Sequence, residues 1–221
     1  MSQPISTTSK IIRATATPAL FAEMASRGRW VMASHLRLLS RAIRQTILGT
    51  DRVRRLLVTM PPRFGKSTLC SHYLPAWYLG TFPDRRIILA AYEADFAAQW
   101  GRKARNTLEE YGPSVFGIEV AGSPASADHW DIAGHDGGMH TAGVGGPITG
   151  FGSDLLVIED PIKNAAEAAS ETYREKIWDW FQSTAYTRLE PDGVAILIQT
   201  RWHAADLAGR LLLDATQGGE A

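Results

Sequence analysis

Hydrophobic and polar positions along the chain follow two kinds of pattern in turn. Short apolar runs, typical of strands buried in a parallel sheet, alternate with longer stretches in which apolar residues recur every three or four positions, as on one face of a helix. The expected strands are Arg55–Met60, Arg86–Ala91, Leu155–Ile158 and Val194–Ile198. The expected helices are Trp30–Leu48, a segment from Gly65 to about Gly80, Asp95–Tyr111, Ala165–Thr187 and Ala205–Leu213. This alternation predicts an α/β fold with a mostly parallel central sheet flanked by helices.

Two stretches lack these patterns. Residues 1–29 open with a polar segment rich in Thr and Ser, and we expect a flexible N-terminal arm there, ahead of a domain over residues 30–221. Residues 112–153 contain 11 of the chain's 20 glycines, so short strands and turns are expected in that region.

Composition narrows the class of protein. With 221 residues and 45% hydrophobic content, the chain can bury one α/β core. Its single cysteine, Cys70, cannot form an internal disulfide and is expected to be a buried, inert thiol. No apolar run reaches the roughly 18 residues of a membrane span and no secretory signal opens the chain, so cytoplasmic residence is expected.

The zero net charge hides an asymmetry. Residues 1–66 carry 12 Lys and Arg against two acidic residues, a net of +10, and the remainder carries 11 against 21, a net of −10. A basic N-terminal part can meet a polyanion such as DNA. It can equally be an ordinary solvated helix surface, and composition alone does not decide between the two.

A phosphate-binding loop is the strongest motif. The apolar run Leu56–Met60 leads into a Pro-bearing turn and then into Gly65-Lys66-Ser67-Thr68, which opens an expected helix. In such a P-loop, backbone N–H groups and the helix N-terminus face the phosphates, Lys66 reaches the β- and γ-phosphates, and the Ser67 hydroxyl binds Mg²⁺. Met60 stands where the usual first glycine is expected. The predicted ATP-binding residues are Pro61, Pro62, Arg63, Phe64, Gly65, Lys66, Ser67 and Thr68.

Two later strand ends add candidate chemistry. Glu159 and Asp160 directly follow the strand Leu155–Ile158, and a carboxylate pair there suits Mg²⁺ binding by one acid and activation of the attacking water by the other. Thr200 and Arg201 end the next strand, and ligands gather at the carboxyl ends of parallel strands. Thr200 is therefore a candidate sensor of the γ-phosphate.

Other polar clusters are weaker signals. The spacing of Asp128, His129, Asp131, His135 and His140 matches no standard zinc pattern, so a polar loop near the nucleotide or DNA is favoured over a metal site. The glycine-rich run 143–150 precedes a strand, which favours turns over a dinucleotide-binding fingerprint.

The combination of motifs resembles the large terminase subunits of tailed phages and prophages. The resemblance rests on Met60–Ser67, Leu74–Gly80, the glycine run 143–150, Asp154–Lys163 and Thr200–His203 with Asp206-Leu207, which follow one another in the family's order. It covers roughly residues 30–213. It implies a three-layer P-loop NTPase fold of the RecA-like, additional-strand class.

The resemblance also implies a function. Members of this family hydrolyse ATP with Mg²⁺ to translocate double-stranded DNA into a procapsid in the bacterial host cytoplasm, working as a homo-oligomeric ring with a small terminase subunit and a portal protein. Their C-terminal nuclease domain is expected to be absent from this chain, which we interpret as a fragment.

By similarity, Arg63 is a candidate stabiliser of the transition state, which makes Lys66, Arg63, Glu159 and Asp160 the predicted catalytic residues. Ser67, Glu159 and Asp160 are the predicted metal ligands, and Thr200 and Arg201 fall in the motif proposed to couple hydrolysis to movement. Arg102, Arg105 and Arg188 are candidates for an arginine that acts on a neighbouring subunit. The acid pair departs from the family, whose members usually have Asp first, and this leaves the role of each acid open.

Three alternatives stay open from the sequence. One is a helicase-type, nucleic-acid-dependent ATPase, although a helicase normally needs a second such domain. Another is a P-loop kinase that phosphorylates a small molecule, which calls for a substrate lid. The third is a non-hydrolysing binding module, which the intact Lys66, Ser67 and acid pair argue against.

Overall fold

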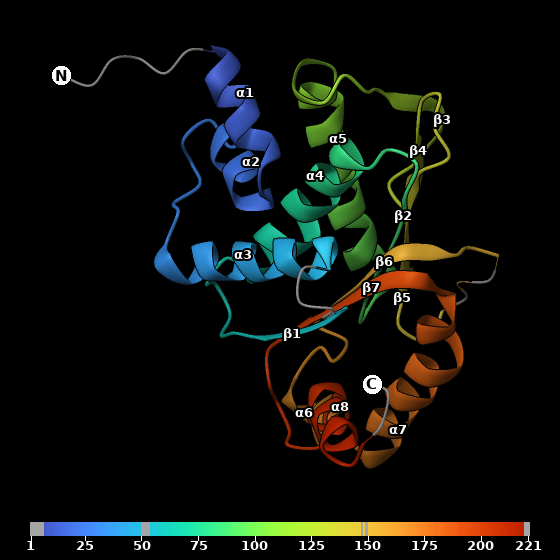
Figure 1. Cartoon of the computed structure of the whole chain (residues 1–221). Helices are drawn as coiled ribbons and strands as arrows, with labels where there is room; N and C mark the ends of the chain where they lie inside the picture. The colour runs from blue at the N-terminus through green and yellow to red at the C-terminus, as the bar shows by residue number, and fades with distance from the viewer. Residues whose placement is uncertain (1–6, 50–53, 147, 149, 219–221) are drawn as a thin grey trace.

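The computed structural model describes residues 7–49, 54–146, 148 and 150–218, and its elements are labelled in Figure 1. The α-helices are α1 (Thr7–Thr15), α2 (Pro18–Ala25), α3 (Ser34–Leu48), α4 (Leu74–Thr81), α5 (Ala94–Val115), α6 (Ala165–Ala169), α7 (Glu171–Trp180) and α8 (Leu207–Thr216). Shorter helical segments are η1 (Thr68–Tyr73) and η2 (Phe181–Ala185), both π-helical, and η3 (Tyr186–Arg188), a 3₁₀ turn. The strands are β1 (Arg55–Thr59), β2 (Arg86–Ala91), β3 (Val120–Ala125), β4 (His129–Ile132), β5 (Gly138–Gly143), β6 (Ser153–Glu159) and β7 (Leu189–Gln199).

The described strands form one seven-stranded sheet in the order β1-β7-β6-β2-β5-β4-β3. All pairs from β1 to β5 in this order are parallel, and the pairs β5–β4 and β4–β3 are antiparallel. The predicted mostly parallel sheet is therefore confirmed. Because β7 lies between β1 and β6, one strand separates the strand that leads into the P-loop from the strand that ends in the acid pair.

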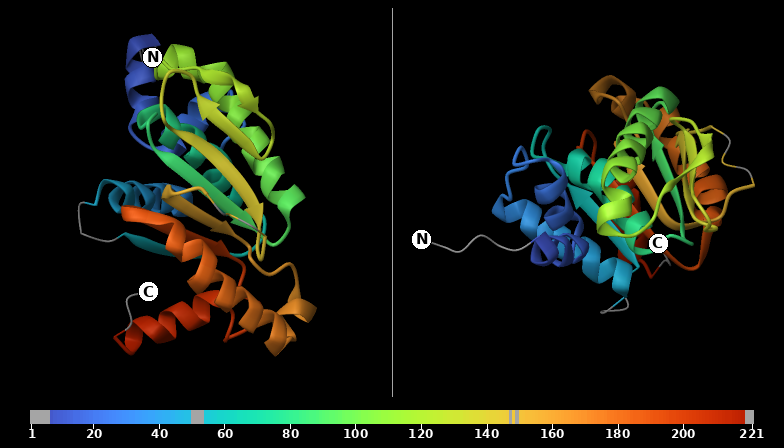
Figure 2. Two further views of the ribbon diagram at one scale, coloured as in Figure 1. Left: turned by 90° about the vertical axis from the view of Figure 1, so that its right-hand side faces the viewer. Right: turned by 90° about the horizontal axis from the view of Figure 1, so that it is seen from above.

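Side chains of the central strands alternate between two cores. In β2, Ile87, Leu89 and Ala91 face the core formed with α2, α3, η1, α4 and α5, whereas Ile88 and Ala90 face the core formed with α6, α7, η2 and α8. The two groups of helices lie on opposite sides of the sheet (Figures 1 and 2). Burial on both faces is why these strands read as continuous apolar runs.

The expectation of a flexible arm over residues 1–29 is wrong for residues 7–25, which form α1 and α2; residues 1–6 lie outside the described part. The Thr17 hydroxyl accepts a hydrogen bond from the Leu20 N–H at 3.2 Å, and Pro18 occupies the first turn of α2. Phe21 is fully buried against the aromatic rings of Tyr73, Tyr111 and Phe116. The pair Thr17-Pro18 is typical of a helix start and was the available signal for α2, and packing against the rest of the domain stabilises this short helix.

Two further regions differ from expectation. The glycine-rich stretch 112–153 contains β5, a full parallel strand next to β2, besides the expected short strands and turns. The single helix expected over residues 165–187 is interrupted at Ser170, whose backbone is extended. The Ser170 hydroxyl accepts a hydrogen bond from the Tyr173 N–H at 3.3 Å, so it ends α6 and caps α7.

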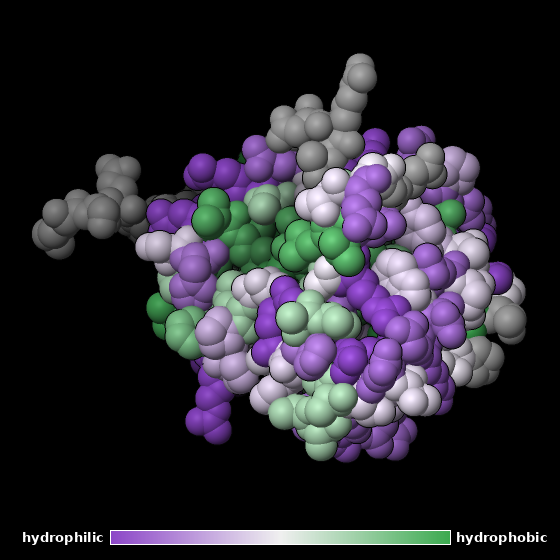
Figure 3. Space-filling model, turned by 90° about the horizontal axis from the view of Figure 1, so that it is seen from below, coloured by the Kyte–Doolittle hydropathy of each residue, from purple (hydrophilic) through white to green (hydrophobic). Residues whose placement is uncertain are grey.

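Seen from below, the molecule shows a hollow lined by apolar side chains among polar ones (Figure 3). On this side of the sheet, a cavity of about 180 Å³ is bounded by residues of α8, β1 and β7, and Leu212 and Leu213 of α8 are exposed. None of the described helices is both long enough and apolar enough to span a membrane.

Candidate nucleotide-binding site

The predicted strand–turn–helix arrangement is present at residues 55–81. After β1, the Met60 N–H donates to the Gln199 carbonyl at 3.3 Å, which ties the start of the loop to the end of β7. Arg63 and Gly65 both have positive φ, and the Leu69 N–H donates to the Gly65 carbonyl at 3.0 Å in the first helical turn. A Cβ at residue 65 would lie 3.1 Å from Leu36 Cδ1 in addition to the positive φ, so both geometry and space favour glycine.

Lys66 joins the loop to the acid pair. Its side chain is buried, and its Nζ lies 2.8 Å from Asp160 Oδ2. Asp160 has a φ of +39°, its N–H donates to the Ile198 carbonyl at 2.8 Å, and its Oδ1 accepts the Thr200 N–H at 2.7 Å. These contacts hold the Asp160 carboxylate at the carboxyl ends of β6 and β7, where its side chain keeps partial exposure.

Glu159 occupies a different environment although it is the adjacent residue. It has no exposed surface, and its two carboxylate oxygens accept hydrogen bonds from two hydroxyls of the P-loop helix, Oε1 from Ser67 and Oε2 from Ser71 at 2.6 Å. Ser71 was not among the predicted site residues. Its spacing of four from Ser67 was the available signal, because residues four apart lie on the same face of a helix.

The electrostatics of Glu159 follow from this burial. Desolvation raises the pKa of Glu159 to about 7, the Ser67 and Ser71 hydrogen bonds oppose this rise, and the charge of Asp160 adds to it. Lys66 also lowers the pKa, but its ammonium group pairs directly with Asp160. A buried carboxylate beside a hydroxyl supplies the hard oxygen donors that Mg²⁺ prefers. Ser67 and Glu159 therefore fit the predicted metal, with Asp160 beside them.

The rest of the loop faces outward. Pro61, Pro62, Arg63 and Phe64 are exposed, and within the described residues the Arg63 guanidinium has no polar partner. The Phe64 carbonyl lies 3.0 Å from His35 Nε2, and the two rings meet edge to face. The N-terminal part of α3 thus supports the loop from the side. Cys70, behind the loop, is buried as expected, and burial raises the pKa of its thiol.

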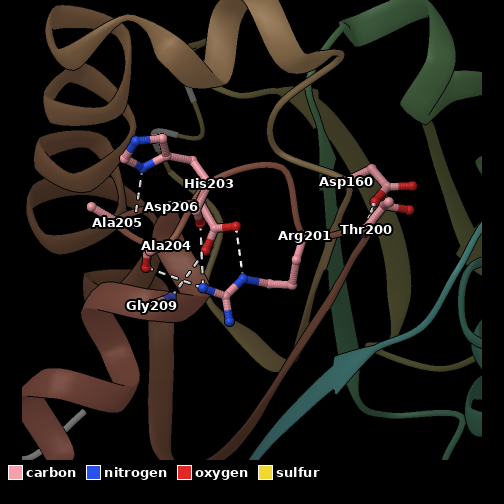
Figure 4. A network of polar contacts seen from close by, with 8 residues as sticks. All are labelled: Asp160, Thr200, Arg201, His203, Ala204, Ala205, Asp206 and Gly209. Atoms are coloured by element: carbon pink, nitrogen blue, oxygen red, sulfur yellow. Dashed lines mark hydrogen bonds and ion pairs between the residues drawn. The ribbon is translucent and has the colours of Figure 1, made fainter.

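Thr200 and Arg201 diverge (Figure 4). Thr200 stays at the site through its N–H bond to Asp160, whereas the Arg201 side chain turns to the segment before α8. There its Nε lies 2.8 Å from the buried Asp206 carboxylate, which also caps α8 by accepting the Gly209 N–H. The described partners of the Arg201 side chain thus lie at the start of α8 and not at the phosphate site, and the coupling role expected of Thr200 and Arg201 stays a prediction.

The three candidate trans-acting arginines have different surroundings. Arg105 donates to the carbonyls of Ala125 and Ser126 and lies 3.5 Å from Glu109, so it fastens α5 to the β3–β4 hairpin. Arg188 directly precedes β7 and lies at the amino ends of the strands, whereas the P-loop follows the carboxyl end of β1, since β1, β6 and β7 are parallel. Arg102 is exposed on α5. Its surroundings leave it the best placed of the three to reach another subunit, and this stays a prediction.

The His and Asp cluster lies away from the P-loop. His129, His135, His140 and Asp131 line a cavity of about 430 Å³ together with the amino-terminal half of β2. The His140 ring stacks on Phe151 with centroids 4.4 Å apart. No group of three potential ligands that could hold a metal ion is found among the described residues. The cluster does not lie near the nucleotide site, because the P-loop lies at the opposite ends of the parallel strands, and the alternative of a polar loop near DNA stays a prediction.

The residues that form this site fall within a known protein family. The family model "Terminase large subunit, T4likevirus-type, N-terminal" matches residues 57–217, which include the P-loop, the acid pair and Thr200. The chain belongs to this family. A search of curated proteins found no match.

A solved structure shares the fold. The crystal structure of the HK97 bacteriophage large terminase superposes with a TM-score of 0.55 and 13% sequence identity. The match covers 80% of this chain and 36% of that chain, so the present sequence spans about a third of the HK97 protein. The predicted family and the predicted P-loop-type fold are both confirmed.

Proposed function

We propose that this domain is the ATPase motor of a phage or prophage large terminase, which hydrolyses ATP with Mg²⁺ to move double-stranded DNA into a procapsid. The N-terminal domain of the family generally serves as the ATPase of DNA packaging. The observation that carries the proposal is the meeting of the P-loop with two carboxylates. Lys66 contacts Asp160, and Ser67 contacts Glu159, at the carboxyl ends of β1 and β6.

The chain's own residues suggest a division of roles. The loop N–H groups and Lys66 bind the triphosphate, and Ser67 and Glu159 hold Mg²⁺. Bound Mg²⁺ neutralises charge that develops on the phosphate oxygens. Asp160, partly exposed and held by the Thr200 N–H, orients the attacking water and accepts its proton. Arg63, exposed on the loop, stabilises charge on the transferred phosphoryl group.

Double-stranded DNA is the proposed polyanionic partner, and α3 offers a surface for it. Arg37, Arg41 and Arg44 are exposed along one face of α3, and no described carboxylate pairs with them. Together with Arg13, they line a cavity of about 490 Å³ between α3 and the α1–α2 segment. At 1.5 Å per residue, the three α3 arginines span about 10 Å of helix, which lets them face successive phosphates.

The proposed assembly follows the family. The domain works as a homo-oligomeric ring with a small terminase subunit and a portal protein, in the cytoplasm of a bacterial host. The helicase-type alternative predicts hydrolysis that depends on nucleic acid without packaging, and the kinase alternative predicts phosphate transfer to a small molecule.

The test is phosphate release from ATP by the purified chain, with and without double-stranded DNA and with Mg²⁺ or EDTA. We expect Mg²⁺-dependent hydrolysis that DNA stimulates, and its loss in Lys66→Ala with an unchanged circular dichroism spectrum. Near-normal turnover by Lys66→Ala at saturating ATP would refute the P-loop assignment. Phosphate transfer to a small acceptor without any effect of DNA would favour a kinase.

A further inference from the structure

The contact between Ser71 and Glu159 has no counterpart in the predicted site. Ser71 has no exposed surface, and its hydroxyl donates to Glu159 Oε2 at 2.6 Å, while Ser67 donates to Oε1 of the same carboxylate. The two serines lie four residues apart at the start of the P-loop helix, Ser67 just before the π-helical segment η1 and Ser71 within it.

Two hydrogen bonds fix the orientation of a carboxylate, which a single hydrogen bond leaves free to rotate. The terminal torsion of a glutamate side chain has broad minima, so a carboxylate held at one oxygen can still rotate about its last bond. A second donor on the other oxygen fixes the plane of the carboxylate. The lone pairs of Oε1 then keep a constant direction relative to the Ser67 hydroxyl, and both oxygens of this fully buried group are satisfied.

The length of the side chain explains why a second serine is needed. Glutamate carries its carboxylate about 1.5 Å further from the backbone than aspartate, the length of one C–C bond. This extra reach brings Oε2 to Ser71. An aspartate at position 159 would stop short of Ser71, so Ser71 can act on this carboxylate only while the residue is glutamate.

We propose that Ser71 is a positioning residue, which holds the Glu159 carboxylate in the orientation that serves the metal beside Ser67, and that its role exists because position 159 is glutamate. The inference rests on the proposed Mg²⁺–nucleotide function. Ser71 itself touches neither nucleotide nor metal in this proposal, so its effect passes entirely through Glu159.

The experiment is a double-mutant cycle read out by binding rather than turnover. Affinity for a fluorescent, non-hydrolysable ATP analogue is titrated against Mg²⁺ in the wild type, Ser71→Ala, Glu159→Asp and the double variant. Loss of an outer partner of a metal ligand typically weakens metal affinity by about 10- to 100-fold, so Ser71→Ala should raise the Mg²⁺ requirement by about tenfold. In the Glu159→Asp background, the same change should have almost no effect.

Controls separate positioning from folding. Analogue binding in EDTA should be equal in the wild type and Ser71→Ala, because the phosphate loop is unaltered. If Ser71→Ala unfolds, Ser71→Cys fills nearly the same space with a weak donor and should show the same raised Mg²⁺ requirement.

An equal loss in the wild-type and Glu159→Asp backgrounds, or no loss in either, overturns the proposal. Normal Mg²⁺-dependent binding by a wild type that does not hydrolyse ATP would contradict the proposed function, yet it leaves the Ser71 comparison decisive. A wild type without Mg²⁺-dependent nucleotide binding overturns both.

Discussion

Two adjacent carboxylates have different surroundings because of the backbone between them. Glu159 is the last residue of β6 and points into the core of α2–α5, where Ser67 and Ser71 meet it. Asp160, with φ at +39°, leaves the strand and reaches Lys66 and the Thr200 N–H instead. This divergence is the geometric basis of the proposed roles, in which Glu159 holds the metal next to Ser67 and Asp160 activates water on the open side of the site.

Substitutions at the two acids should separate binding from turnover. Asp160→Asn should bind Mg²⁺–ATP with little loss but fail to hydrolyse it, because an amide cannot accept the proton of the attacking water. Glu159→Gln should weaken Mg²⁺-dependent nucleotide binding, whereas Glu159→Asp should stay active. Equilibrium binding and phosphate release, measured separately for each variant, check these outcomes. Turnover by Asp160→Asn, together with tight binding and no turnover by Glu159→Gln, would reverse the two roles.

The sequence predicted which residues lie together where motifs end neighbouring parallel strands, although their roles stay predictions. Lys66, Ser67 and the two acids come together as expected, because a P-loop and a carboxylate-ended strand have fixed positions in a parallel sheet. The direction of the Arg201 side chain was not predictable, since it depends on Asp206, a buried carboxylate that needs a partner. Ser71 was not predicted as a site residue, because a serine inside an apolar helix usually has no catalytic or binding role.

At the level of elements, periodicity was most reliable for strands buried on both faces. β2 has the predicted bounds Arg86–Ala91, because every position after the first is buried. β5 was not predicted because its sequence, with His140 and Thr141 side by side between glycines, is neither a continuous apolar run nor a regular alternation. α1 and α2 were missed because short helices gain their stability from packing against other elements rather than from their own sequence.

The packing of η1 against α5 contains a pH-sensitive group. His72 is largely buried, its Nε2 lies 2.8 Å from Thr107 Oγ1, and its ring stacks on Tyr73. Burial, followed by the charge of Lys103, lowers the pKa of His72 to about 4. The neutral form is therefore the one that the folded protein favours.

Acidification should weaken the fold through this histidine. Its pKa in the folded state is below the unfolded value of about 6.5, so its contribution to the free energy of unfolding is fully present above pH 6.5 and is lost as the pH falls toward 4. The loss should amount to up to about 3 kcal/mol. Urea unfolding at pH 7 and pH 4.5 should show a smaller difference for His72→Gln than for the wild type. Other titrating groups, Glu159 included, are common to both proteins and cancel in this comparison. An equal pH dependence in both would contradict the assignment.

The exposed arginines of α3 should make the affinity for DNA depend on salt concentration. If Arg37, Arg41 and Arg44 each neutralise one phosphate, changing all three to glutamate should abolish most DNA binding, and changing all three to glutamine should lower the slope of log affinity against log salt by about 3. Fluorescence anisotropy with double-stranded DNA at several salt concentrations measures both effects. The matched control replaces the three arginines by lysine, which keeps the charge and should keep the slope. Hydrolysis without DNA should be unchanged in every variant, and unaltered DNA affinity of the glutamate variant would rule out α3 as the contact surface.

For the whole molecule, the arrangement of the site suggests that one subunit is not enough. The P-loop lies at an open edge of the sheet, where Arg63 and Phe64 are exposed. Arginines supplied by a neighbour are worth about 10³–10⁵ in rate in related phosphoryl-transfer enzymes. Arg105 is already bound within its own chain, and Arg188 lies at the amino end of β7, away from the P-loop, so Arg102 on α5 is the candidate that the fold leaves available.

Mixing two inactive variants should reveal this contact. Lys66→Ala loses phosphate binding but keeps Arg102, whereas Arg102→Ala keeps its own P-loop but cannot serve its neighbour. Each alone should be a poor ATPase, and the equimolar mixture at high protein concentration should regain a substantial part of the activity, because an intact P-loop then meets an intact arginine across the interface. ATP hydrolysis per subunit should also rise with the concentration of the wild type, from nanomolar to high micromolar. If Arg102→Ala alone is as active as the wild type at every concentration, Arg102 has no such role. If both variants are inactive alone and their mixture regains no activity, Arg102 acts within its own subunit.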